Sequence, residues 1–233
     1  MNKFLNRILN KYNKARYASK KASKFHIKQA PMIFVKTPKT GSTAIQHLLH
    51  KHRSWLFMNE LMNRPGFDLR GQNLSTHIIG VGSYKARMKF EAQYPDIWEQ
   101  AYKFSVVRNP YSKALSSWRY CPSTKDKSLL EALSNPPKEE ENFHDYMHFT
   151  KTQTSMLTRD GEIYVDELLR YENLNEEWRN FCDKHEIAAG DLPMLNKTAR
   201  KKTKEELTSE EIKLINELFA EDFETFGYEM MQP

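Results

Sequence analysis

The sequence has few of the features that define several classes of protein. Its 233 residues include two cysteines, Cys121 and Cys182, which form no C-x-x-C pair and lack metal-binding spacing. Two cysteines exclude a small disulfide-stapled domain, and they fit either a reducing compartment or a scaffold that needs no disulfides. No run approaches the ~20 apolar residues that a membrane-spanning helix needs. The positive N-terminus lacks the apolar core of a secretory signal, and no internal repeat stands out.

Acidic residues are missing from the first quarter of the chain. Residues 1–59 hold no Asp or Glu but 13 Lys and Arg, whereas the remainder holds 23 basic and 30 acidic residues, within a net charge of +6. Such asymmetry indicates an anionic partner, which could be a nucleotide, a polyanion or a membrane surface, or else a solvated basic tail. Residues 1–28 have the spacing of a basic amphipathic helix, which can lie on a membrane or cap the domain itself. We therefore expect an N-terminal arm over 1–29 and one domain over 30–233.

The remaining pattern alternates apolar strands with amphipathic helices. The chain is long enough for one domain with a sizeable core, and 39% of its residues are apolar. Strands are predicted at 32–35, 103–107 and 163–165. Helices are predicted from about 44, from about 111, and at 83–93, 143–157, 174–186 and 208–225. This alternation predicts an α/β fold with a central, mainly parallel sheet and helices on both faces.

A short polar loop follows the first predicted strand. It reads Pro38-Lys39-Thr40-Gly41-Ser42-Thr43 and leads into a helix. A strand, loop and helix in this order aim backbone N–H groups at an anion, and Lys39 and the hydroxyls add donors. The usual nucleotide loop places its lysine after two glycines, whereas Lys39 precedes the only glycine here. The loop by itself therefore predicts an anion site without naming the anion.

A second polar segment follows the strand predicted at 103–107. Arg108 comes directly after that strand, at the edge where open α/β sheets bind their ligands. Ser116 lies eight residues later, about two helical turns, so both side chains could converge on one phosphate. Taken alone, Arg108 would be read as a surface ion-pair partner and Ser116 as an ordinary helix residue.

Together, the two segments resemble the sulfotransferases that use 3′-phosphoadenosine 5′-phosphosulfate (PAPS), in their carbohydrate, family 2-like branch. That family carries a P-K-T-x-S/T-T loop and, about 65 residues later, an F-x-x-V-R-N-P-x-x-R-x-x-S segment, matched here by Phe104 to Ser116. The similarity continues through "LLRYENL" at 168–174, "LPMLNKT" at 192–198 and "AEDFETFGYEM" at 220–230. It implies a P-loop NTPase-like, three-layer fold.

The resemblance also implies how the donor is bound. The loop, with Lys39, Thr40, Gly41, Ser42 and Thr43, would hold the 5′-phosphosulfate. Arg108 and Ser116 would hold the 3′-phosphate, and Lys197, Thr198 and Arg200 would close over the nucleotide. The sequence departs from the family at Lys113, where arginine is usual, and lysine cannot make a bidentate fork.

Transfer of a sulfuryl group to a hydroxyl needs a base and a cation beside the leaving oxygen. Lys39 is the candidate cation. Histidine suits the base because its pKa lies near neutrality, and the family places its catalytic histidine about thirty residues before V-R-N-P. His77 occupies that position, and Glu60 is the reserve because some relatives use a carboxylate.

We therefore expect a PAPS-dependent sulfotransferase acting on a hydroxyl acceptor, a glycan or glycolipid, with adenosine 3′,5′-bisphosphate as product and without metal or nucleic acid. The Golgi relatives in animals have a membrane anchor that this chain lacks, so a cytoplasmic, bacterial-type enzyme is expected, with peripheral membrane contact through residues 1–28 left open. Two alternatives stay open, a small-molecule or nucleotide kinase on the same fold and a non-catalytic polyanion-binding module.

Overall fold

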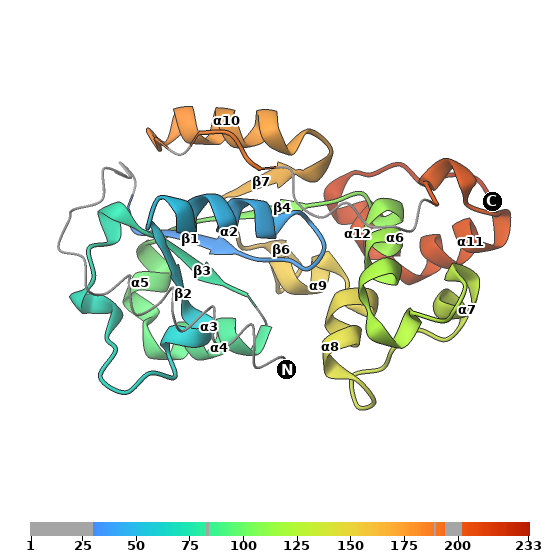
Figure 1. Ribbon diagram of the computed structural model, residues 1–233, viewed down its shortest axis with the longest axis horizontal. Coiled ribbons are helices and arrows are strands. Elements are labelled where there is room, and N and C mark those ends of the chain that lie inside the picture. The colour runs from blue at the N-terminus through green and yellow to red at the C-terminus, as the bar shows by residue number, and fades with distance from the viewer. Residues whose placement is uncertain (1–29, 83, 189, 194–201) are drawn as a thin grey trace.

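The computed structural model describes residues 30–82, 84–188, 190–193 and 202–233 (Figure 1). The arm predicted over residues 1–29, and with it the proposed membrane contact, lies outside the described residues. So do Lys197, Thr198 and Arg200 of the predicted nucleotide-closing segment. None of the described helices is long and apolar enough to cross a membrane.

A five-stranded parallel sheet forms the centre of the molecule. Its strands lie in the order β2-β3-β1-β4-β7, and every neighbouring pair is parallel. In chain order they are β1 (Met32–Val35), β2 (Trp55–Phe57), β3 (Ile78–Val81), β4 (Tyr102–Val107) and β7 (Glu167–Arg170). Continuous apolar runs form β1 and β3, and Val106 and Val107 end β4, because a parallel sheet is buried on both faces. The predicted α/β fold is thus confirmed, as are the strands predicted at 32–35 and 103–107.

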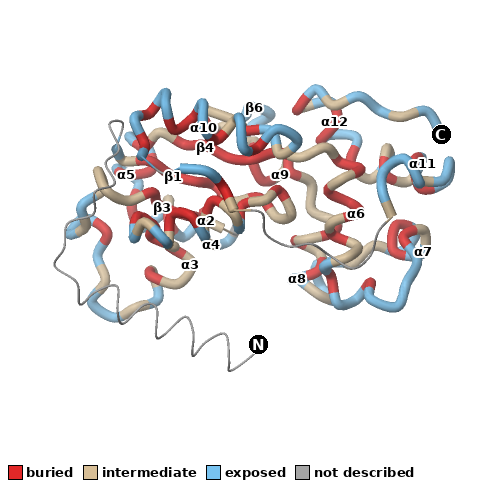
Figure 2. The backbone as a smooth tube through the Cα atoms, turned by 45° about the horizontal axis from the view of Figure 1, so that its top comes forward, coloured by how far each residue is buried: buried red, intermediate tan, exposed pale blue. Residues whose placement is uncertain are grey.

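One face of the sheet is covered by α2 (Ser42–Lys51) and α10 (Leu174–Lys184). Phe34 and Phe104 point to this side and stack on one another, with ring centroids 4.8 Å apart. Phe104 in turn packs against Trp178 and Phe181 of α10. Figure 2 shows buried residues concentrated in β1 and β4 while the outer side of α10 is exposed.

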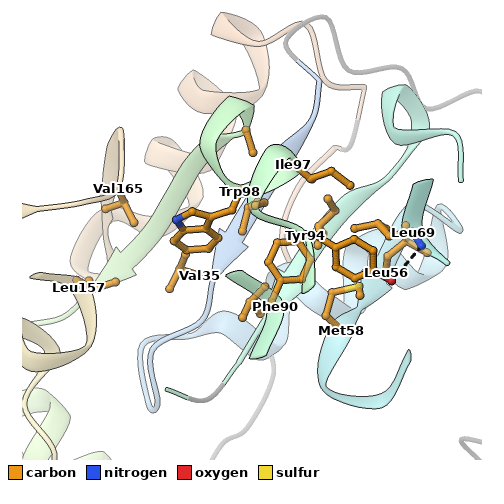
Figure 3. Close-up of a cluster of buried hydrophobic side chains, with 14 of the residues drawn as sticks. Val35, Leu56, Met58, Leu69, Phe90, Tyr94, Ile97, Trp98, Leu157 and Val165 are labelled. Atoms are coloured by element: carbon orange, nitrogen blue, oxygen red, sulfur yellow. Dashed lines mark hydrogen bonds between the residues drawn. The ribbon is translucent and has the colours of Figure 1, made fainter. Parts of the chain in front are cut away.

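The opposite face is covered by α3 (Met58–Leu61), α4 (Tyr84–Gln93) and α5 (Pro95–Gln100). Val35 points to this side, because successive residues of a strand face opposite ways. Figure 3 shows it in one cluster with Phe90, Tyr94 and Trp98. The Tyr94 hydroxyl accepts a hydrogen bond from the backbone N–H of Leu69 at 3.3 Å. The sheet therefore has helices on both faces, as the sequence predicts.

A helical lobe extends beyond the carboxyl ends of β1 and β4 (Figure 1). It holds α6 (Pro110–Tyr120), α7 (Leu129–Ser134), α11 (Ser209–Leu218) and α12 (Ala220–Phe226), which share an apolar cluster. The single helix predicted over 143–157 is instead three pieces: α8 (Phe143–Asp145), a π-helical turn (Tyr146–Thr150) and α9 (Gln153–Leu157). The helix predicted over 208–225 is α11 and α12, with Phe219 at their junction.

The prediction of a sheet strand at 163–165 is wrong, because that strand lies elsewhere. Glu162 and Ile163 form β6 (Glu162–Ile163), which pairs with β5 (Thr158–Arg159) in a separate antiparallel hairpin. The sheet strand is β7, four residues later. Both side chains of β6 are exposed. The short apolar run that suggested a buried strand therefore belongs to the end of this hairpin and to the residues that follow it.

Gly80 marks the tightest contact within the sheet. A Cβ added to Gly80 would lie 2.0 Å from the indole of Trp55, which is fully buried. Replacing Gly80 by alanine should lower the free energy of unfolding by about 3 kcal/mol, the upper end of ordinary overpacking. Chemical denaturation would measure it. Gly71→Ala is the matched control, since nothing lies near its added Cβ, and its change should stay within about 0.5 kcal/mol. Equal midpoints for both variants would contradict this packing.

Candidate active site

The loop between β1 and α2 ends in an uncapped helix N-terminus. Gly41 is the N-cap residue of α2, with φ of 79°, and no side chain caps the first turn. The first N–H groups of this ten-residue helix therefore point to the loop without side-chain partners. The left-handed conformation of Gly41, and the positive φ of 64° at Lys39, curve the loop around that end. This is the geometry in which proteins bind phosphate and sulfate groups.

Hydrogen bonds to the sheet hold the loop in place. The Thr37 hydroxyl donates to the carbonyl of Val106 at 2.6 Å, which ties the loop to β4. The Thr40 hydroxyl donates to the Thr37 carbonyl at 3.0 Å, and Thr40 is fully buried. The prediction that the Thr40 hydroxyl faces the ligand is therefore wrong, because that hydroxyl is used inside the loop.

Close contact with a second element explains why glycine occupies position 41. A Cβ there would lie 2.9 Å from the ring of Tyr171 and 3.0 Å from Leu174. Tyr171 directly follows β7 and Leu174 begins α10, so the segment after β7 packs against the loop. A side chain at position 41 would push the two apart.

Arg108 joins the second sequence motif to the first. Its Nη1 donates to the carbonyl of Lys39 at 2.9 Å, and its guanidinium lies 3.8 Å from the centroid of Tyr171. The backbone of Arg108 is bracketed by Gln153, which accepts from its N–H at 2.8 Å and donates to its carbonyl at 2.9 Å. Buried Asp222 accepts in turn from the side chain of Gln153 at 3.1 Å. Arg108 is thus fixed in position while its buried Nε has no hydrogen-bond partner among the described residues.

A cleft of about 1110 Å³ opens over these elements. Several predicted donor-binding residues line it together: Lys39, Gly41, Ser42, Thr43, Arg108 and Ser116. Further lysine and arginine side chains line the same cleft: Lys36, Arg119 and Arg179. The two motifs, almost seventy residues apart in the chain, therefore form one basic cleft.

The electrostatics of the cleft favour an anion. Burial lowers the pKa of Lys39 to about 8, and the nearby charge of Arg108 acts in the same direction. Burial likewise lowers the pKa of Lys36 to about 8, against the opposing effect of Glu60. Crowded, partly desolvated cations are stabilised when an anion enters between them. The described residues contain no group of three or more His, Cys, Asp or Glu side chains that could hold a metal ion.

His77 does not belong to this cleft. It precedes β3 at the end where the parallel strands begin, since Ile78 pairs with Met32, whereas the loop follows Val35 at the other end. At ~3.3 Å per residue, the strand separates the two positions by roughly 13 Å. The Nδ1 of His77 lies 2.9 Å from both the Thr76 hydroxyl and the Asn73 carbonyl. The assignment of His77 as base is therefore corrected, and its place on the amino side of the sheet is the reason.

Glu60 and Lys113 also lie outside the lining of the cleft. Glu60 belongs to α3 next to Asn59, which does line it, and acts electrostatically on Lys36. Lys113 is fully buried, and its Nζ donates to the carbonyl of Lys151 at 3.1 Å. Lysine in place of the usual arginine at 113 thus leaves the lining of the cleft unchanged.

Sequence reasoning missed several lining residues, among them Lys36, Asn59, Tyr120 and His148. Lys36 directly follows β1, so its place at the sheet edge was a usable signal. Tyr120 and His148 come from α6 and the π-helical turn, and only the packing of these two elements brings their rings within 4.7 Å. No pattern in the sequence indicates that contact.

Comparisons with known proteins identify the family of the chain. A family model described as "Sulfotransferase family" matches residues 24–229. Among solved structures, the chain is similar to a sulfotransferase from Alicyclobacillus acidocaldarius, at 14% identity and a TM-score of 0.48, over 87% of this chain and 96% of that one. No curated protein matches the chain. Because the family model spans most of the sequence, including the loop and the Arg108 segment, the chain belongs to the sulfotransferase family.

Proposed function

We propose that the sulfate donor is PAPS and that the acceptor is a hydroxyl of a carbohydrate or glycoconjugate. The main observation in support of this donor is the hydrogen bond between the two motifs, which Arg108 donates to the carbonyl of Lys39. This contact places a helix N-terminus and a lysine beside a half-buried arginine. A ligand with two separate anionic groups suits such a pair of sites, and PAPS has a 5′-phosphosulfate and a 3′-phosphate.

Each group of the donor has matching residues. The 5′-phosphosulfate would lie on the N-terminus of α2, against Lys39, Ser42 and Thr43. The 3′-phosphate would meet Arg108 and Ser116, and the free buried Nε of Arg108 is available for it. Lys197 and Thr198 remain proposed donor contacts from the segment outside the described residues.

The chemistry is an in-line transfer. The acceptor oxygen attacks sulfur, the bond between sulfur and the bridging oxygen breaks, and negative charge grows on the 5′-phosphate. Lys39 would stabilise that charge, because it lies in the loop that holds the leaving group. No step needs a metal, since lysine, arginine and backbone N–H groups meet the charge of the donor.

The size of the cleft supports a second substrate. Ligand pockets commonly measure ~300–1,000 Å³, and this cleft exceeds that range at about 1110 Å³. Asn59 and Gly82 line it on the side of α3 and β3, beyond the loop. A glycan can enter from there and place one hydroxyl near Lys39.

Calorimetry with adenosine 3′,5′-bisphosphate tests the donor. The wild-type protein should bind it at least about tenfold more tightly than adenosine 5′-monophosphate, since one charge-assisted contact is worth about 1.5–3 kcal/mol. Radiolabelled sulfate should then pass from PAPS to a panel of unsulfated glycans.

Three results would contradict the proposal. Equal affinity for the two nucleotides would remove the 3′-phosphate site. Turnover that depends on ATP and magnesium would favour the kinase. Binding of heparin-like polymers without affinity for the bisphosphate would favour a polyanion-binding module.

A further inference from the structure

A histidine that the donor does not use lies in the wall of the cleft. His148 belongs to the π-helical turn Tyr146–Thr150, and its backbone is fixed because its carbonyl accepts from the Ser117 hydroxyl at 2.6 Å. Its ring lies 4.7 Å from that of Tyr120, centroid to centroid, and both rings line the cleft. The turn thus holds an imidazole toward the space that the substrates would share.

The imidazole packs against neighbouring rings, but its buried nitrogen has no hydrogen-bond partner among the described residues. Its Nδ1 is buried and makes no hydrogen bond to any described residue. Its Nε2 makes no hydrogen bond to a described residue either, yet it is not one of the unbonded buried atoms, so it is the nitrogen that reaches the cleft lined by His148. A structural histidine normally satisfies at least one ring nitrogen within the protein. A histidine whose ring nitrogens are not used in the structure, and which lies beside the expected reaction site, is suited to interact with the substrate.

The position relative to Lys39 suits proton transfer. The Nζ of Lys39 lies 3.5 Å from the centroid of Tyr120, the same ring that His148 contacts. His148 is therefore one aromatic ring away from the cation expected at the leaving oxygen. An acceptor oxygen placed for in-line attack must lie beside that end of the donor.

The carboxylates that line the cleft are less suited to the task. Glu172 accepts from the backbone N–H of Asn109 at 2.8 Å and lies 3.1 Å from the Tyr228 hydroxyl, so both of its oxygens are engaged. Glu176 is exposed on the first turn of α10, on the side of the cleft formed with Tyr171. Neither approaches the ring of Tyr120 in any recorded contact among the described residues.

Burial and, to a smaller extent, the nearby positive groups keep His148 neutral. Burial lowers its pKa to about 4, and His144, Lys39 and Lys113 act in the same direction while Asp145 opposes them. His144 stacks on His148 at 4.6 Å and is paired through Nδ1 with Asp145 at 2.7 Å. At neutral pH the ring therefore has a free lone pair. An anionic donor in the cleft would offset the charge of Lys39 and make the imidazole more basic.

We propose that His148 is the base that accepts the proton of the attacking hydroxyl. This proposal rests on the proposed function. The acceptor O–H proton passes to Nε2 of His148 while the acceptor oxygen forms a bond to sulfur. The bond from sulfur to the bridging oxygen breaks, and its electron pair stays on the 5′-phosphate of adenosine 3′,5′-bisphosphate. The imidazolium then releases its proton to water, and the sulfate ester leaves.

His148→Gln tests this role, because glutamine keeps the approximate volume without a basic nitrogen. Two readouts are used, release of labelled sulfate from PAPS to water or to the glycan panel, and calorimetry with adenosine 3′,5′-bisphosphate. Turnover should fall about 10²-fold, while the Kd for the bisphosphate stays within about twofold. The loss of activity of the wild-type enzyme toward acid pH, where His148 becomes protonated, should disappear in the variant. If the role of His148 were merely structural, the variant would still lose activity toward acid pH as the wild type does.

Two matched variants sharpen the result. His47→Gln removes an exposed imidazole of α2 that does not line the cleft and should keep turnover near the wild-type value. Glu60→Gln removes the reserve base. Full turnover of His148→Gln, or a larger loss in Glu60→Gln than in His148→Gln, would overturn the role of His148 while leaving the proposed function intact. A wild-type protein that neither binds the bisphosphate nor releases sulfate would remove the proposed function and this role with it.

Discussion

Replacing Lys39 by methionine is expected to lower kcat/KM for sulfate transfer from PAPS about 10³-fold. Lys39 would have two tasks, binding the 5′-phosphosulfate and stabilising the leaving oxygen. Loss of one preorganised donor at a developing charge costs about 10²–10³ in kcat, and weaker donor binding adds to it. Radiolabelled sulfate transfer measures the change. Methionine keeps the length of the side chain, so its contact with the ring of Tyr120, 3.5 Å from Nζ in the wild type, should largely remain.

The control is Lys51→Met, at the exposed end of the same helix. It removes the same charge from α2 but far from the loop, and should leave kcat/KM unchanged. Equal rates for Lys39→Met and Lys51→Met would show that the loop does not hold the reacting group.

The pH dependence gives a second signature of Lys39. Its pKa of about 8 lies below the ordinary lysine value because the side chain is partly buried. Below pH 8 the ammonium is present before the ligand arrives. Above pH 8 binding must first protonate the amine, so affinity for adenosine 3′,5′-bisphosphate should fall by up to tenfold per pH unit, until the higher pKa of the bound form is reached. In Lys39→Met the affinity should fall less steeply above pH 8, because the contribution of Lys39 is gone. The fall that remains is assigned to Lys36, which has a similar pKa.

Local sequence signals were sufficient for the parts of the site that are continuous in the chain. The apolar run of β1, the glycine with a positive φ and the stripe of α2 together define the loop, and the structure contains all three. Arg108 follows the same logic, since it directly succeeds β4. In a parallel sheet, residues that follow neighbouring strands meet at one edge, so β1 and β4 bring Lys39 and Arg108 together.

The failure at His77 has a specific cause. The run Ile78–Val81 was not recognised as the strand β3, so His77 had no assigned end of the sheet. As the residue before a parallel strand, it must lie at the edge opposite the loop. For assigning a catalytic residue, its distance in sequence from a motif is therefore weaker evidence than which end of the nearest strand it adjoins. His148 could not be found in this way, because its approach to Lys39 depends on how a π-helical turn packs against α6.

Replacing Arg108 by alanine should weaken binding of adenosine 3′,5′-bisphosphate about 10²- to 10³-fold. The guanidinium is largely enclosed, and burial lowers its pKa, so its charge is poorly solvated in the free protein. Removing one partner of a buried, hydrogen-bonded charge pair costs 2–5 kcal/mol, and 1.4 kcal/mol corresponds to tenfold. Affinity for adenosine 5′-monophosphate, which lacks the 3′-phosphate, should change much less. Calorimetry with both nucleotides measures the ratio.

Two further variants separate binding from structure. Arg108→Lys keeps a charge but not the planar fork, so it should recover only part of the affinity even if the loop stays in place. Arg179→Ala removes an exposed arginine of the same cleft that is paired with Asp191 at 2.7 Å, and should cost no more than about 1 kcal/mol. Because Arg108 also donates to the Lys39 carbonyl, its loss could loosen the loop and weaken both nucleotides equally. Equal weakening would assign Arg108 to support of the loop, whereas selective loss of the bisphosphate would assign it to the 3′-phosphate.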